Sequence, residues 1–119
     1  MSRPHRRFDL DAPSRPGSLN ARLEELGELY LKTLLARGYS PRSVKAYRAN
    51  LKLLRRYVDG CGSLRNLVDI GPGELDEFAS WLMTTGGEKV RAASGRQNVL
   101  STTRSFFKYL TKTGILLAD

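Results

Sequence analysis

The sequence predicts a small all-α protein built from four helices. Four segments carry apolar residues at spacings of three and four, the repeat that places side chains on one face of an α-helix. Serine, proline and glycine residues separate these segments at positions where helices typically begin or end. No segment longer than a few residues alternates polar and apolar side chains as a strand does. We therefore expect four helices of about 12 to 19 residues around one core.

The first helix is expected to follow a basic N-terminal arm. Residues 1–18 contain three prolines and several arginines but few apolar side chains, so we expect them to be flexible and disordered, ahead of a domain of residues 19–119. Ser18 can act as the N-cap of a helix that ends near Gly38. The apolar residues of this helix are Leu19, Leu23, Leu26, Tyr30 and Leu34.

The second helix is predicted from Ser40-Pro41 to about Val58. A serine side chain can accept a hydrogen bond from a free backbone amide, and proline suits the first helical position, where no N–H is needed. Its apolar stripe is Val44, Tyr47, Leu51, Leu54 and Val58. Its bases lie off that stripe, and they are Arg42, Lys45, Arg48, Lys52 and Arg56. A short apolar linker is expected to pack beneath this helix through Leu64, Leu67, Val68 and Ile70.

Two further helices complete the predicted bundle. Gly71-Pro72-Gly73 precedes a helix from Glu74 to Thr85, with Leu75, Phe78, Ala79 and Leu82 facing inward. Gly86 and Gly87 then open a basic loop, and Ser94 is the expected N-cap of a helix from Gly95 to Thr113. The central stripe of the last helix is Val99, Thr103, Phe106 and Leu110. The aromatic side chains are expected to pack in the core, with Tyr57 and Tyr109 at its rim.

Charge is separated along the chain. The net charge is +8, which favours a polyanionic partner. Residues 37–58 contain seven bases and no acid, and residues 89–112 contain six bases and no acid. Residues 69–88 between them contain five acids and no base. Exposed helix faces usually mix both signs, so simple solvation explains this pattern less well than a binding role for the second and fourth helices.

The start of the fourth helix also carries side chains that could read bases. Arginine can pair with guanine, and glutamine or asparagine with adenine, when a helix end enters the major groove. Residues with this capacity are Arg96, Gln97, Asn98 and Ser101. An ordinary polar first turn explains Gln97 and Asn98 equally well, so sequence specificity is left open.

Other chemistry finds no support in the sequence. Cys61 and His5 are the only residues of their types, so no disulfide, thiolate zinc site or cysteine–histidine pair is expected. No phosphate-binding glycine loop is present, and we expect neither catalysis nor a cofactor. No apolar run approaches the length of a membrane span and the N-terminus does not resemble a secretory signal, so we expect a cytoplasmic protein without membrane contact.

Two segments resemble a known family. GYSPRSVKAYRANLKLL, residues 38–54, is similar to the opening helix pair of the N-terminal core-binding domain of tyrosine recombinases, the phage integrase and Xer group. SGRQNVLSTTRSFFKYLTKTGIL resembles the last helix of that domain, and with LVDIGPGELDEFASWL between them the resemblance covers residues 19–117. The sequence departs from the family pattern at Asn50, where the family often has an acid.

The resemblance implies a fold and a function. The family domain is a SAM-like four-helix bundle that clamps duplex DNA at one arm of a recombination site with its second and fourth helices, while a separate domain holds the catalytic residues. By resemblance, the residues facing DNA are Arg42, Ser43, Lys45, Arg48, Ser94, Arg96, Asn98, Ser101, Arg104 and Lys108. Helix phase and base-reading capacity add Lys52 and Gln97. The resemblance gives none of the tyrosines here the role of nucleophile, and no catalytic domain is expected before Asp119.

The leading hypothesis is thus a non-catalytic DNA clamp of a recombinase that integrates or resolves DNA. Its expected partners are duplex DNA and, in a full-length protein, other recombinase protomers, with the isolated domain a monomer. A helical protein-interaction module with a basic surface for an acidic partner is the alternative. A helix-turn-helix repressor is a third interpretation, although the connection between the third and fourth helices is longer than the usual three or four residues.

Overall fold

Four α-helices and one short 3₁₀-helix make up the regular structure of the described residues. The computed structural model describes residues 18–61, 64–84 and 93–116. The helices are α1 (Leu19–Ala36), α2 (Pro41–Gly60), η1 (Leu67–Asp69), α3 (Pro72–Met83) and α4 (Ala93–Lys112). The predicted all-α class is confirmed. The expected arm before Ser18 and the basic loop after Gly86 lie outside the described residues.

The first two helices form an antiparallel pair that starts from serine caps. Ser18 Oγ accepts a hydrogen bond from Ala21 N at 3.0 Å, and Ser40 Oγ accepts one from Ser43 N at 3.1 Å. Both caps were predicted and both are confirmed. Between the helices Gly38 adopts a φ of 97°, a backbone conformation that glycine reaches without steric cost, and the chain reverses there.

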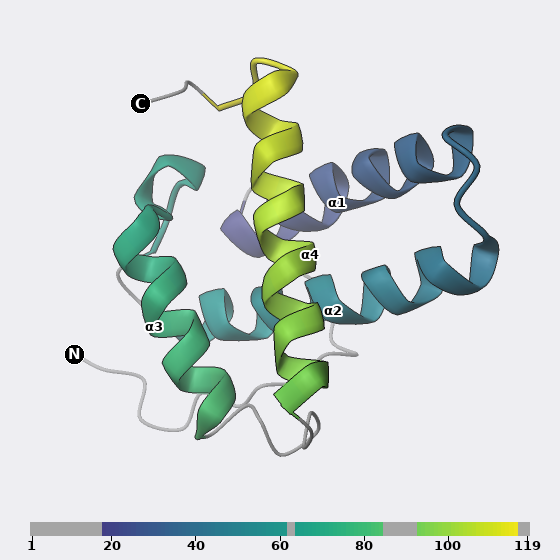
Figure 1. Ribbon diagram of the computed structural model, residues 1–119. Helices are drawn as coiled ribbons and strands as arrows, with labels where there is room; N and C mark the ends of the chain where they lie inside the picture. The colour runs from purple at the N-terminus through teal and green to yellow at the C-terminus, as the bar shows by residue number, and fades with distance from the viewer. Residues whose placement is uncertain (1–17, 62–63, 85–92, 117–119) are drawn as a thin grey trace.

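The other helices pack on this pair. In Figure 1, α4 crosses α1 and α2, and α3 runs beside α4 in the opposite direction. The central helix is α2, because its contacts with the other helices are the most extensive, above all those with α1 and α4. The core therefore forms where α1, α2 and α4 meet, and α3 closes one side of it.

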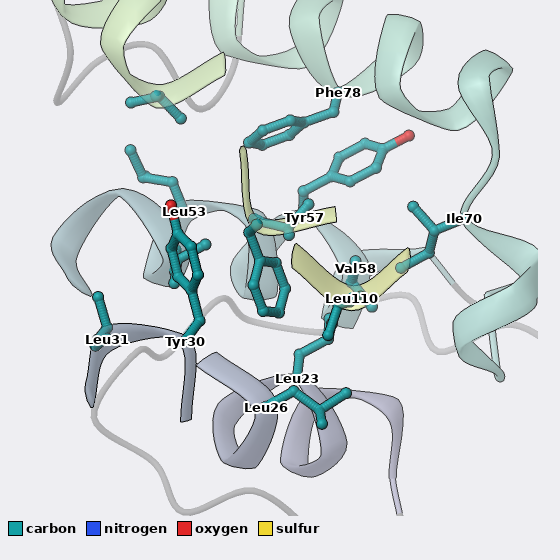
Figure 2. Packing of buried hydrophobic residues seen from close by; sticks show 14 of the residues in the cluster. Leu23, Leu26, Tyr30, Leu31, Leu53, Tyr57, Val58, Ile70, Phe78 and Leu110 are labelled. Atoms are coloured by element: carbon teal, nitrogen blue, oxygen red, sulfur yellow. The ribbon is translucent and has the colours of Figure 1, made fainter. Parts of the chain in front are cut away.

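The predicted core is largely confirmed. All five apolar residues expected in α1 are buried, as are four of the five in α2 and all four in α4. The buried hydroxyl of Thr103 donates to the Val99 carbonyl at 2.9 Å, so it leaves no unpaired donor in the core. Phe78 and Leu82 of α3 are fully buried, and Figure 2 shows Phe78 beside Tyr57.

Four details of the prediction are wrong. The third helix begins at Pro72, because proline suits the first helical position and Glu74 Oε1 accepts a bond from Gly71 N at 2.8 Å; it ends at Met83. The fourth begins at Ala93, so Ser94 lies within its first turn and is not the N-cap. Tyr57 is 7% exposed and packs in the core, not at the rim, because α3 covers it. Val68 is 77% exposed, because the linker packs mainly through the buried Ile70.

Candidate nucleic-acid interface

Arg48, one of the predicted site residues on α2, pairs with a carboxylate of α1. Its Nε lies 2.9 Å from Glu28 Oε2 and its Nη2 lies 2.9 Å from Glu28 Oε1, so the ion pair is bidentate. The hydrogen bond from Arg48 lowers the pKa of Glu28, and the same bond raises the pKa of Arg48. Arg48 is therefore engaged within the protein, although both side chains remain about half exposed.

Arg55 makes a second link between the same helices. Its Nε donates to Asn20 Oδ1 at 2.9 Å, and its guanidinium lies 3.6 Å from Glu24 Oε1. Only 15% of its side chain is exposed. Arg48 and Arg55 are two helical turns apart on the side of α2 that faces α1. Gly27 of α1 packs against Leu51 between them, since a Cβ at Gly27 would lie 3.4 Å from Leu51 Cδ1.

The other predicted bases of α2 lie beside Arg48, farther around the helix from α1. Arg42 and Lys45 are exposed and Lys52 is half-buried, and their spacings of three and seven place them along one row. Ser43 is half-buried, and its Oγ accepts a bond from the Ser40 hydroxyl at 3.1 Å. The predicted residues of α2 thus comprise three bases that face solvent wholly or in part (Arg42, Lys45 and Lys52), Arg48 paired with Glu28, and Ser43 bonded to the cap residue Ser40.

On α4, four predicted residues share one exposed face. Gln97, Ser101, Arg104 and Lys108 follow one another at spacings of four, three and four, and all four are exposed. At about 100° per residue this face is opposite the buried stripe of the same helix. We call it the α4 polar face. It contains two bases and no acid.

The remaining predicted residues of α4 lie beside this face. Asn98 is exposed on one flank, and Arg96 is half-buried nearer the core side. Ser94 lies in the first turn, and its side chain is outside the described residues.

Two side-chain hydrogen bonds fix α4 across the α1–α2 pair. Asn50 Nδ2 of α2 donates to Thr102 Oγ1 of α4 at 2.9 Å, and Thr102 is 4% exposed. Tyr30 of α1 donates through its hydroxyl to Ser105 Oγ of α4 at 2.8 Å. Sequence reasoning missed this set, although Asn50 had been marked by its departure from the family pattern. These bonds hold the α4 polar face at a set position relative to α2.

The acids of the third helix lie at its start and on its exposed surface. Asp76 and Glu77 are exposed on α3, and Glu74 caps the helix start. In the described part of the chain, no three histidine, cysteine, aspartate or glutamate residues gather where they could bind a metal ion. No helix within residues 18–61, 64–84 and 93–116 is long and apolar enough to cross a membrane.

The fold and this charge arrangement define a class: a small all-α bundle whose central and last helices each present an outward basic, acid-free side. The chain belongs to the family described as phage integrase, N-terminal SAM-like domain, whose model matches residues 28–114. The resemblance found in the sequence is thereby confirmed, and the bundle is of the SAM-like type.

Curated relatives agree with this assignment. The chain is 31% identical over 97 residues to proteins named tyrosine recombinase XerC from two strains of Lactobacillus delbrueckii subsp. bulgaricus and from Lactobacillus leichmannii. The match covers 82% of this chain and 30% of each relative, so the chain spans about a third of their length. No solved structure matches the chain.

Proposed function

We propose that this chain is the DNA-binding, core-binding domain of a tyrosine-type site-specific recombinase and that it clamps duplex DNA at a recombination site. The observation that carries the proposal is the α4 polar face. The Asn50–Thr102 hydrogen bond fixes α4 across α2, and α2 has exposed bases of its own. Family membership and relatives named tyrosine recombinases support it. Strand cleavage and rejoining belong to other parts of such a recombinase.

Each surface has a role in the proposed clamp. Arg42, Lys45 and Lys52 on α2 and Arg104 and Lys108 on α4 neutralise backbone phosphates, which supplies affinity without reading sequence. Gln97, Asn98 and Ser101 lie toward the N-terminal end of α4, and side chains of these types can pair with base edges in the major groove. Phosphate contacts on two crossing helices would orient the start of α4 relative to the duplex.

The wider assignments follow from the same proposal. Residues 19–119 form the DNA-binding domain, and residues 1–18 precede it as a basic arm. The partners are one arm of a recombination site and, in a full-length recombinase, neighbouring protomers. Since the partner is DNA, we propose the cytoplasm as the place of action.

Salt dependence of duplex binding tests the clamp. Neutralising about five phosphates predicts a log–log slope of affinity against salt near −4 to −5. Binding is measured by fluorescence anisotropy with a labelled duplex at several salt concentrations. A slope near zero, or no duplex binding at low salt, contradicts the proposal and favours a protein-interaction module with an acidic partner.

A matched pair of variants tests the location of the surface. Arg42→Gln with Arg104→Gln removes two charges from the clamp, whereas Arg22→Gln with Arg65→Gln removes two equally exposed arginines elsewhere. The first pair should weaken binding about tenfold or more and make the slope shallower by about 1.8, since each phosphate contact contributes about 0.9. The second should change affinity by less than about threefold. Equal losses would show that total charge, not a shaped surface, drives binding.

A further inference from the structure

Glu28 of α1 neutralises a charge in the middle of the basic side of α2. Arg48 lies three residues after Lys45 and four before Lys52, so all three side chains leave α2 on neighbouring parts of its surface. Without Glu28, Lys45, Arg48 and Lys52 would form one continuous basic row. With it, the middle member is held by both oxygens of a carboxylate at 2.9 Å.

The Arg48–Glu28 ion pair is more exposed to solvent than the neighbouring contact of Arg55 with α1. Arg55 is 15% exposed and also bonded to Asn20, which suits a purely structural contact between helices. Arg48 and Glu28 are 45% and 49% exposed, so both are within reach of solvent and of an approaching polyanion. An exposed ion pair contributes little to folding stability, which leaves its effect on the surface charge as the larger consequence.

We propose that Glu28 is an affinity-limiting residue of the DNA clamp: it occupies Arg48 as a phosphate would and keeps the middle of the α2 basic row out of the DNA contact. This inference rests on the proposed function. A carboxylate presents two oxygens to the guanidinium fork much as a phosphate does, so a duplex gains little by displacing it. This pairing weakens the part of DNA binding that comes from phosphates alone. The contacts of α4 with base edges are unaffected. A larger share of the binding free energy therefore depends on the base sequence of the duplex.

Two variants separate this role from a change in total charge. Glu28→Gln releases Arg48, and Glu25→Gln removes the same charge from an exposed position on the same helix without releasing an arginine. Glu28→Gln should bind a mixed-sequence duplex about three- to tenfold more tightly at about 0.1 M salt, with a slope steeper by about 0.9, the contribution of one extra phosphate contact. Glu25→Gln should stay within about twofold of the wild-type chain, with an unchanged slope. Equal effects of the two variants overturn the inference.

A double variant tests whether Arg48 stays with Glu28 when DNA binds. Glu28→Gln combined with Arg48→Gln replaces the ion pair by two neutral side chains of similar shape. The inference predicts wild-type affinity and slope for this double variant. A shallower slope and weaker binding would show that Arg48 leaves Glu28 for a phosphate, and would overturn it.

Folding and the wider proposal are monitored separately. Circular dichroism and thermal unfolding confirm that each variant is folded at the assay temperature, and the slope does not depend on the active fraction of a preparation. If the wild-type chain binds DNA and only the Glu28 comparisons fail, the clamp stands and the role of Glu28 falls. If the wild-type chain shows no salt-dependent duplex binding, both proposals fall.

Discussion

Tyr57 shows how the environment of one residue sets a dependence on pH. Its ring lies 5.3 Å from that of Phe78 and 5.7 Å from that of Trp81. Burial raises the pKa of its phenol above the ordinary value of 10, and the neighbouring Cys61 thiol adds to the increase. The neutral phenol is therefore favoured in the folded state. Its contribution to stability is present below pH 10, the ordinary value, and is lost as pH rises above it.

We therefore predict alkaline destabilisation that depends on Tyr57. The melting temperature should fall as pH rises from about 9 to 11, and Tyr57→Phe, which keeps the ring but cannot ionise, should show a smaller fall. Circular dichroism melts across this range measure both. Because burial also raises the pKa of Tyr30, Tyr57→Phe should reduce the fall without abolishing it. Identical profiles for the two proteins would contradict the prediction.

Gln97 and Asn98 carry a prediction about sequence discrimination. If their amides pair with adenine edges, the double variant Gln97→Ala, Asn98→Ala should discriminate less between preferred and random duplexes. The loss should be about 1–3 kcal/mol for each bidentate contact removed. Selection from a random duplex pool supplies the preferred sequence, and competition assays measure the ratio. The salt slope should not change, because neither residue is charged. Unchanged selectivity would show that neither amide contacts a base.

At the scale of a helix, the serine caps are the clearest local determinants. Ser18 and Ser40 each accept a hydrogen bond from one backbone amide at the start of a long helix. These helices, α1 and α2, pack against each other. Ser18→Ala and Ser40→Ala should each lower the free energy of unfolding by about 1 kcal/mol, whereas Ser18→Asp should retain most of it. Urea unfolding provides the measurement. A loss at Ser18→Asp equal to that at Ser18→Ala would show that the side-chain bond is not the cause.

The crossing of α2 and α4 depends on a polar contact between helices. Asn50 and Thr102 should show coupling of about 1 kcal/mol in a double-mutant cycle of Asn50→Ala and Thr102→Val, because either single change leaves a partner without its bond. Urea unfolding of the four proteins measures it. Strict additivity would mean that packing alone sets the crossing.

The serine caps of α1 and α2 and the main apolar face of each helix could be predicted from the sequence. The bounds of α3 and α4 and the burial of a second face of α2 could not. Ser94 resembles a cap as closely as Ser18 does, yet Ala93 before it is a strong helix former, and the helix begins at Ala93, two residues before the predicted Gly95. Tyr57 lies outside the single apolar stripe of α2 and is buried because α2 contacts three helices. A periodic pattern describes one packed face, so it misses the second face of a central helix.

At the scale of the whole molecule, the separation of charge was visible in the sequence and its internal pairing was not. The acid-free stretches directed attention to α2 and α4, where the described structure has exposed bases. The partners of Arg48 and Arg55 are 20 and 31 residues away along the chain, on α1. Only the antiparallel packing of the two helices brings them together, so a list of basic residues overstates what α2 presents to DNA.

Binding should be detectable as a change in the stability of the whole molecule. A duplex at about 100 times its dissociation constant should stabilise the folded chain by about 2.7 kcal/mol, which for a domain of this size raises the melting temperature by about 10 °C. The shift should disappear at about 1 M salt and shrink for Arg42→Gln with Arg104→Gln. Thermal melts with and without duplex provide the measurement. A shift of equal size at high salt would point to an apolar contact with the duplex.

The packing of α3 gives the molecule an internal optical reporter. Trp81 is the only tryptophan of the chain, and it stacks on Phe78 with ring centroids 5.9 Å apart, on the helix that closes one side of the core. Its emission therefore follows the docking of α3, whereas far-ultraviolet dichroism follows all the helices at once. If the two signals change at the same urea concentration, α3 unfolds together with the other helices. If the emission changes first, α3 detaches while the α1–α2 pair and the crossing α4 remain assembled.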